Sequence, residues 1–348
     1  MMPEEWPIAA SAADGNGPAR LAGRGRLPTV RRDFFLDPAK RLTEQERALM
    51  TAMLRCLVGD VAAAVRAALP SGRAAANDEG DAALIQQMTG AGLLDEPELM
   101  ALLLRRADEE RIAMSARARS GRREARVLQG LVSHDYGAVA AAAMALILAR
   151  GRRRDRFGQC LIAFDDLSAA SADVLVHSVA AGLRREVAAT RSLPGADLEL
   201  AQAAEQVVGE WDEERGIDAL TAALVHFLDE ADGLTDELVL AAGNEGEIGF
   251  VAEVIAARAG IPVGSAIDEL LSGEARHVMA LLRAAAFSRD VAAGLLAGIG
   301  DLLGIDDAAT AIDLFDGMGE AEVEAERSWL TTAPPYRAAL DRLGQGRG

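Results

Sequence analysis

The feature that most constrains this chain is the spacing of apolar residues between positions 43 and 69. Apolar side chains recur there at three- and four-residue steps, which places them on one face of a helix. Thr43 followed by Glu46 has the spacing of a capping box at a helix start, and Pro70 is a stop signal. We therefore expect one long amphipathic helix, with an apolar face made of Met50, Met53, Leu54, Leu57, Val61, Val65 and Leu69.

Similar apolar faces recur along the rest of the chain, separated by capping residues, glycines and prolines. Half of the residues are apolar and only 4% are aromatic, a composition rich in Ala and Leu that favours helices over sheets. No stretch alternates with the strand period for long enough to compete. We expect an all-α fold of stacked antiparallel helical hairpins, an α-solenoid of about a dozen helices. The candidate N-terminal caps include Asp95, Asp135, Ser171, Asp218, Thr235, Ser288 and Asp306.

Charge and composition suggest how the chain is divided. Residues 1–30 are rich in Gly, Ala, Pro and Arg without periodic apolar positions, and we interpret them as a flexible leader. Residues 31–192 would form an N-terminal helical repeat region. Residues 193–348 would form an acidic C-terminal helical region, since residues 201–348 carry 28 acidic and 9 basic side chains.

The same charge balance excludes several classes of function. The net charge of −18 argues against binding of the whole protein to nucleic acid or to an anionic membrane surface. No window reaches the roughly 18 uninterrupted apolar residues that a membrane span requires, and the N-terminus lacks the pattern of a signal peptide. Cys56 and Cys160 are expected to be buried, reduced thiols. We therefore predict a cytoplasmic protein that makes no membrane contact.

Several segments resemble a large bacterial family, of alphaproteobacterial type, that is catalogued only as a domain of unknown function. They run from Phe34 to Pro38, from Leu42 to Leu49, and from Leu234 to Leu240 followed by Gly243, Phe250, Gly260-Ile261-Pro262 and Leu281 to Ala286. The resemblance covers most of residues 34–345. It implies HEAT-like repeats of paired antiparallel helices and a bacterial cytosolic setting. It implies no catalytic residue, substrate or cofactor.

The residues that could carry chemistry are few. The four histidines lack the spacing of a helical zinc site, and the single lysine, Lys40, excludes a phosphate-binding loop of the Gly-Lys type. We expect no metal and no cofactor. The triplet His134, Asp135 and Tyr136 is the best candidate for a polar site, either as a proton-transfer group or as a loop histidine beside a helix cap.

Arginines are concentrated in two stretches of the first half. They form a candidate basic patch that suits carboxylates or phosphates. Two other interpretations stay open: a plain solvated face, or a surface that docks on acidic side chains of the same chain or of a second copy. The patch consists of Arg119, Arg122, Arg123, Arg126, Arg150, Arg152, Arg153, Arg154 and Arg156.

The favoured hypothesis is a non-enzymatic interaction scaffold or regulatory adaptor, because stacked helical pairs present long surfaces for other proteins. Its partner would be a protein, with an acidic surface as one candidate, and self-association stays open. The alternative is an enzyme or a small-ligand-binding protein with a site in a helical cleft near His134 and Asp135. A deep pocket ringed by converging titratable groups would argue against the scaffold hypothesis.

Overall fold

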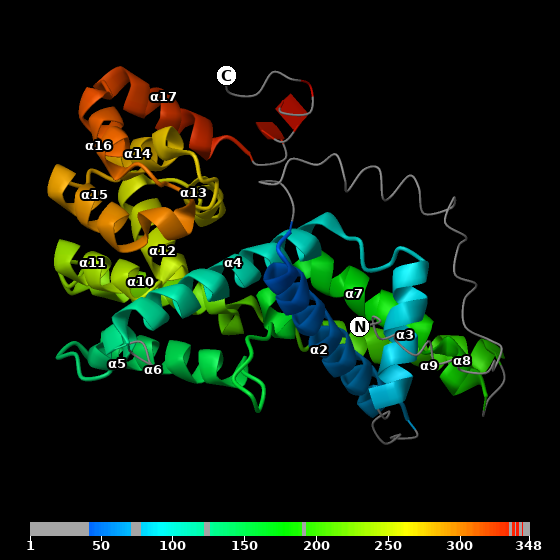
Figure 1. The fold of residues 1–348 in the computed structure, drawn as a ribbon. Coiled ribbons are helices and arrows are strands. Elements are labelled where there is room, and N and C mark those ends of the chain that lie inside the picture. Colours follow the sequence, from blue (N-terminus) through cyan, green and yellow to red (C-terminus); the bar gives the residue numbers. More distant parts are fainter. Residues whose placement is uncertain are drawn as a thin grey trace, which may run out of the picture. The chain divides into compact units, whose positions relative to one another are not determined.

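The computed structural model describes residues 42–70, 78–121, 126–189, 193–333, 336, 337, 339, 340 and 343 (Figure 1). Within these ranges the chain forms the α-helices α2 to α17 with short 3-10 and π segments, and it contains no strand beyond an isolated bridge between Arg154 and Cys160. The predicted all-α class is confirmed. The predicted flexible leader, residues 1–30, lies outside the described residues. By its contacts the chain divides into Met1–Glu44 and a compact unit, Gln45–Gly348.

The long helix expected from the apolar spacing is α2, Glu44–Ala68. Its buried side includes Met53, Leu57 and Val61, each at most 2% exposed. By length and composition alone α2 could cross a membrane, and 44% of its most apolar window is buried inside the protein. A core helix with one buried face has the same composition, and packing in the interior accounts for it here.

One buried cluster, the first cluster, contains α2 together with segments from both halves of the chain. Residues such as Met53, Leu103, Val179 and Ala204 are fully or almost fully buried in it. Burial of this apolar surface is the main favourable contribution to folding. Its helices besides α2 are α3 (Asp78–Gly90), α4 (Pro97–Ser120), α7 (Ala169–Gly182), α8 (Arg184–Ala188) and α9 (Leu193–Val208).

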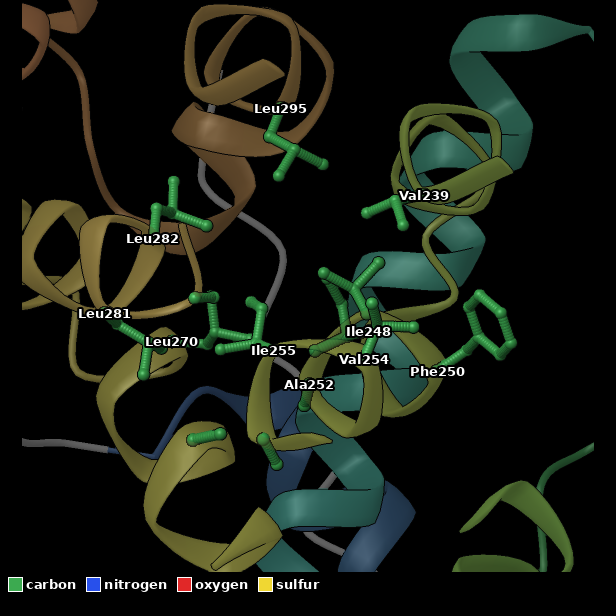
Figure 2. Close-up of a cluster of buried hydrophobic side chains, with 14 of the residues drawn as sticks. Val239, Ile248, Phe250, Ala252, Val254, Ile255, Leu270, Leu281, Leu282 and Leu295 are labelled. Atoms are coloured by element: carbon green, nitrogen blue, oxygen red, sulfur yellow. The ribbon is translucent and has the colours of Figure 1, made fainter. Parts of the chain in front are cut away.

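The second cluster is larger and contains most of the buried apolar residues of the acidic C-terminal region. Figure 2 shows its centre, where Ile255 of α12 lies beside Leu270 of α13, and Ile248 lies on the side of α12 that faces Val239 of α11. Its helices besides α4 are α5 (Arg126–Leu131), α6 (Gly137–Arg152), α10 (Ile217–Glu230), α11 (Asp236–Asn244), α12 (Ile248–Ala259), α13 (Val263–Leu270), α14 (Ala275–Ala284), α15 (Arg289–Leu295), α16 (Ala308–Gly317) and α17 (Glu320–Thr331).

Helix α4 is shared by the two clusters. Its first half buries Leu99 and Leu103 in the first cluster, and Ile112 lies in the second. The clusters also interleave along the sequence, since α9 contacts α7 whereas α6 contacts α10. A division of the chain between residues 192 and 193 would separate each of these helices from its packing partner.

Some helix starts agree with the sequence and others are displaced by a few residues. Thr235 caps α11 and Ser288 caps α15, in each case by accepting a hydrogen bond from the backbone amide three residues later. The caps of α4 and α7 are Glu96 and Ser168, not the predicted Asp95 and Ser171. These shifts are small because any short acceptor near the helix start can satisfy its free amides.

Three other predicted N-cap residues do not cap their helices. The N-cap of α6 is Tyr136, without a side-chain cap bond, so Asp135 does not cap this helix. The cap of α16 is Asp307, one residue after the predicted Asp306. Helix α10 begins after Gly216, which leaves Asp218 free to bind arginines of α4. The helices also outnumber the expected dozen, because several are only five to ten residues long.

Candidate functional site

A cavity of about 490 Å³ lies among α4, α5, α6, α10, α12 and α13, and we call it the charged cavity. Its volume is within the range of small-molecule sites, roughly 300–1,000 Å³. Part of the wall is apolar, including Leu128, Ile147, Ile248 and Ile267. The rest consists of charged side chains: Arg106, Glu109, Glu110, Arg117, Arg150, Arg153, Arg154, Asp166, Asp218, Glu247 and Glu253.

A glycine turn brings α12 close to α4 and so forms one wall of the charged cavity. Gly246 has a φ of +75°, a conformation that favours glycine. A Cβ atom at this position would lie 2.7 Å from Cα of Ala113, so only glycine allows this approach. One turn of chain further, Gly249 opens the wall in front of Glu109, because a Cβ there would lie 3.7 Å from Glu109 Oε1.

The most buried ion pair of the wall joins Arg153 and Asp166. Arg153 Nε and Nη2 donate to the two carboxylate oxygens at 2.7 and 2.8 Å, and the side chains are 9% and 1% exposed. Arg153 also donates to the carbonyl oxygens of Ala149 and Arg215. Asp166 accepts further bonds from the backbone amides of Ala163 and Ile217. This pair therefore fixes the end of α6 to the start of α10.

Two more arginines from the end of α6 reach acidic side chains on other helices. Arg154 donates through Nη1 and Nη2 to the two carboxylate oxygens of Glu110 on α4, at 2.6 and 2.7 Å. Arg150 pairs with Glu247, just before α12, and Glu247 is only 9% exposed. Arg117 contributes a longer contact of 3.5 Å to Glu110. These pairs tie α6 to both α4 and α12.

A third group of charges connects α4 with α10. Arg106 Nη2 donates to Asp218 at 2.7 Å and its Nη1 donates to Glu109 Oε2 at 2.7 Å, and Arg105 pairs with the second oxygen of Asp218. Burial alone would raise the pKa of Asp218, but the charges of Arg106 and Arg105 outweigh it and lower this pKa to about 2. Asp218 is therefore ionised at any physiological pH.

Two acidic groups of the wall differ from the rest in their bonding. Among the described residues, Glu109 Oε1 is buried without a hydrogen-bond partner. Glu253, one turn after Gly249 on α12, has no bonded partner within the described ranges and lines the same cavity. Desolvation, with a smaller contribution from the charge of Asp218, raises the pKa of Glu253 to about 7. A carboxyl group with this pKa can accept or release a proton near neutral pH.

Cys160 also lines the charged cavity. Burial first, and then the charge of Glu110, raise the pKa of its thiol to about 11. Because the thiolate is the nucleophilic form, this thiol is protonated near neutral pH and is poorly suited to covalent catalysis. Cys160 and Cys56 are both free and partly buried; the sequence correctly predicted free thiols but overestimated their burial.

The predicted basic patch is divided by the structure. Arg150, Arg153 and Arg154 bind carboxylates of the same chain in the wall of the charged cavity, which is the self-docking interpretation for these three residues. Arg119 pairs with Asp301 at the surface. Arg126, Arg152 and Arg156 are exposed, with Arg156 lying over the ring of Phe157. Arg122 and Arg123 lie outside the described residues.

The predicted polar triplet lies elsewhere. His134 accepts a hydrogen bond from the backbone amide of Tyr136 at 3.1 Å, and the Tyr136 hydroxyl lies 3.4 Å from a carboxylate oxygen of Glu230. Asp135 and Tyr136 are exposed. None of the three lines the charged cavity. Among the described residues no group of acidic, His or Cys side chains could hold a metal ion.

Sequence reasoning missed the carboxyl groups of the cavity. Asp218 was interpreted as a cap, and Glu109 and Glu253 were not considered. One signal for Glu253 was available, because it is the only charged residue among the first ten residues of α12 (Ile248–Ala259), which are otherwise apolar or glycine; Arg258 follows in the last turn. An ionisable residue within such an apolar stretch of a buried helix is expected to face either a buried partner or a cavity.

Comparison with known proteins identifies a family and no function. Residues 88–327 match the model of a family described as uncharacterised proteins conserved in bacteria. Every residue that lines the charged cavity falls within this range. No curated protein and no solved structure matches the chain.

Proposed function

Because this chain belongs to a bacterial family, DUF2336, whose description names no activity, we propose a function from its own geometry: it binds a small molecule in the charged cavity. The observation that carries the proposal is the cavity of about 490 Å³ with both apolar walls and unbonded carboxyl groups. A site of this size and mixed lining is typical of small-molecule recognition. We place the protein in the bacterial cytoplasm.

The role we propose is regulation without catalysis. The thiol of Cys160 is held protonated, and Glu253, although its pKa is about 7, is not hydrogen-bonded to a second acid, base or nucleophile in the described part of the chain. A ligand in the cavity would contact α4, which is shared by the two clusters, and it would therefore stabilise both of them. Such a protein would act as a sensor, with the helices as the responding element.

We further propose that the second cluster is a degenerate HEAT-like stack. Consecutive helices contact one another in this region, α11 with α12, α12 with α13, and α13 with α14. Contacts between sequence neighbours are what a repeat array requires. The stack would present the cavity-lining helices in a fixed order.

A second candidate function, docking of a protein partner, is favoured by the outer face of α6. Met144 and Leu148 are one helical turn apart and 42% and 52% exposed. Phe157, beyond the end of α6, is 80% exposed beside Arg156. Apolar side chains next to arginines are typical of interface centres. Docking here would make the ligand-binding protein an adaptor as well, as the sequence suggested.

The ligand proposal is tested by a screen on the full chain with a library of bacterial metabolites. A true ligand should bind 1:1 in native mass spectrometry and raise the melting temperature by about 3 °C or more at saturating concentration. The substitution Gly249→Leu should abolish binding because it places a side chain in the cavity, where the Cβ itself fits without a clash.

The matched control is Gly264→Leu on α13. Gly264 is exposed, and a Cβ there would meet no atom within 4 Å. This variant should bind the ligand like the unmodified protein. If Gly249→Leu binds equally well, the ligand lies outside the charged cavity and the proposal is wrong. If the library yields no ligand at all, the proposed function is wrong.

A further inference from the structure

We infer that the ligand of the charged cavity carries a cationic nitrogen, an ammonium or guanidinium group on an apolar body, and that this nitrogen binds between Glu109 and Glu253. The inference rests on the proposed function and adds the chemical class of the ligand. It follows from which charged groups of the wall are already bonded and which are not.

Each arginine of the wall already pairs with at least one carboxylate of the same chain. Arg106, Arg150 and Arg153 each bind at least one carboxylate of the same chain, and Arg154 and Arg117 share Glu110. An incoming phosphate or carboxylate would compete with these carboxylates for the arginines, or would add a negative charge next to them. Breaking a buried pair leaves its partner charge uncompensated, which is strongly unfavourable. The pairing of Arg150, Arg153 and Arg154 with carboxylates therefore favours a cationic ligand over an anionic one in this cavity.

The carboxyl groups show the opposite situation. Glu109 binds Arg106 through Oε2 alone, and its Oε1 is buried without a partner in the described part of the chain. A buried acceptor that makes no hydrogen bond is costly to the folded state. Glu109 Oε1 is the nearest atom to the position that a Cβ on Gly249 would occupy, at 3.7 Å, so the absence of a side chain there leaves space beside the buried oxygen.

Glu253 supplies the second acceptor from the neighbouring turn of α12. On α13 the cavity is lined only by Val263 and Ile267. The charged groups that line the cavity together with Glu253 are Arg106, Glu109, Glu110 and Arg117 on α4, Arg150, Arg153 and Arg154 at the end of α6, Asp166, Asp218 on α10, and Glu247 before α12. Arg106 is engaged by Glu109 and Asp218. Burial and the charge of Asp218 raise the pKa of Glu253 to about 7, and a cation bound beside it would lower this pKa again.

The apolar part of the wall defines the rest of the ligand. This part of the cavity wall consists of the apolar side chains of Leu128, Ile147, Ile248 and Val263, which cannot form hydrogen bonds. A ligand that fills this volume and removes these side chains from water gains affinity in proportion to the buried area. A short alkyl or aryl amine, or the corresponding guanidine, combines both requirements.

The test compares three probes of equal length with the full-length protein: hexylammonium, hexanoate and 1-hexanol. Binding is followed by isothermal titration calorimetry and by saturation-transfer NMR at pH 8 and pH 6. Hexylammonium and hexanoate keep their charges at both values. Hexylammonium should bind saturably and more tightly than either of the other probes.

The pH dependence separates ligation by Glu253 from simple partition into an apolar pocket. With a pKa of about 7 for Glu253, the ionised fraction falls about tenfold from pH 8 to pH 6, and affinity for hexylammonium should fall by a similar factor. Glu253→Gln should weaken binding at pH 8 by about 10- to 100-fold and remove the pH dependence. The control Glu237→Gln, an exposed carboxyl on α11 outside the cavity, should change neither.

The outcomes distinguish the inference from the proposed function. If hexanoate or hexanol binds as well as hexylammonium, the cationic class is wrong while the cavity remains a binding site. If hexylammonium binds with no pH dependence in the unmodified protein, Glu253 is not its partner and the inference fails even without the variant. If no probe binds and the metabolite screen also yields nothing, both are wrong.

Discussion

The pair of Arg153 and Asp166 gives the sharpest test of how the charged cavity is built. Replacing Arg153 by Met keeps an unbranched apolar stem and removes the charge and all four side-chain hydrogen bonds. The carboxylate of Asp166, whose side chain is 1% exposed, would then be left with only the two backbone amides that it already binds.

The expected cost follows from that burial. Removing one partner of a buried ion pair destabilises a protein by about 3–5 kcal/mol. With a urea m-value near 3 kcal/mol per M, which is typical of larger domains, the unfolding midpoint should fall by roughly 1–1.7 M. Urea titration followed by far-UV circular dichroism measures this shift.

The neighbouring residue provides a matched control. Arg152 is exposed and no ion pair or side-chain hydrogen bond is described for it, so Arg152→Met should change the free energy of unfolding by less than about 0.5 kcal/mol. Equal effects of the two substitutions would refute the assignment of Arg153 as a buried structural residue. In a double-mutant cycle with Asp166→Asn, a coupling energy near zero would refute the pairing itself.

Two further predictions concern the walls of the charged cavity. Gly246→Ala should destabilise the protein by about 2–4 kcal/mol, because the added Cβ would be strained at a φ of +75° and would lie 2.7 Å from Cα of Ala113. Thermal unfolding measures this loss. An effect no larger than that of Gly264→Ala, at an open helical position, would contradict the close packing. Glu253→Gln should raise the free energy of unfolding, compared with the unmodified protein, by more at pH 8 than at pH 5. The folded-state pKa of about 7 lies above the reference value of 4.5, so the stability associated with protonated Glu253 is complete below pH 4.5 and is lost as the pH rises through 7. Parallel urea titrations at the two pH values check this, and a difference between variant and unmodified protein that is independent of pH would show that Glu253 titrates normally.

The exposed arginines matter for any search for a protein partner. Charge reversal of Arg153 or Arg154 would break pairs with Asp166 or Glu110, so loss of a partner after such a change would reflect damage to the fold. Arg152 and Arg156 are exposed, and their reversal tests the surface without touching the cavity.

The helices could be predicted from the sequence because their determinants are local. In α2 the apolar spacing, the stop at Pro70 and the helix-forming residues between them all act within a few turns. Thr235 and Ser288 were correctly predicted as caps for the same reason, since each bonds an amide three residues away. Local patterns did not determine how the helices pack against one another.

The charged cavity could not be predicted because its pairs join distant parts of the chain. Asp218 has the position of a helix cap, and only the fold shows that it binds Arg105 and Arg106, more than one hundred residues earlier. Arg153 and Arg152 are adjacent and chemically identical, yet one is buried and the other exposed. Sequence composition gives the same expectation for both.

Because α4 packs in both clusters, the number of residues between Leu103 and Ile112 is fixed. An α-helix turns by about 100° with each residue, so one residue inserted between Leu103 and Ile112 would swing the second half of α4 by that angle. Ile112 could then no longer face the second cluster while Leu103 faces the first. We therefore expect α4 to tolerate neither an insertion nor a deletion between Leu103 and Ile112, whereas loops can vary in length.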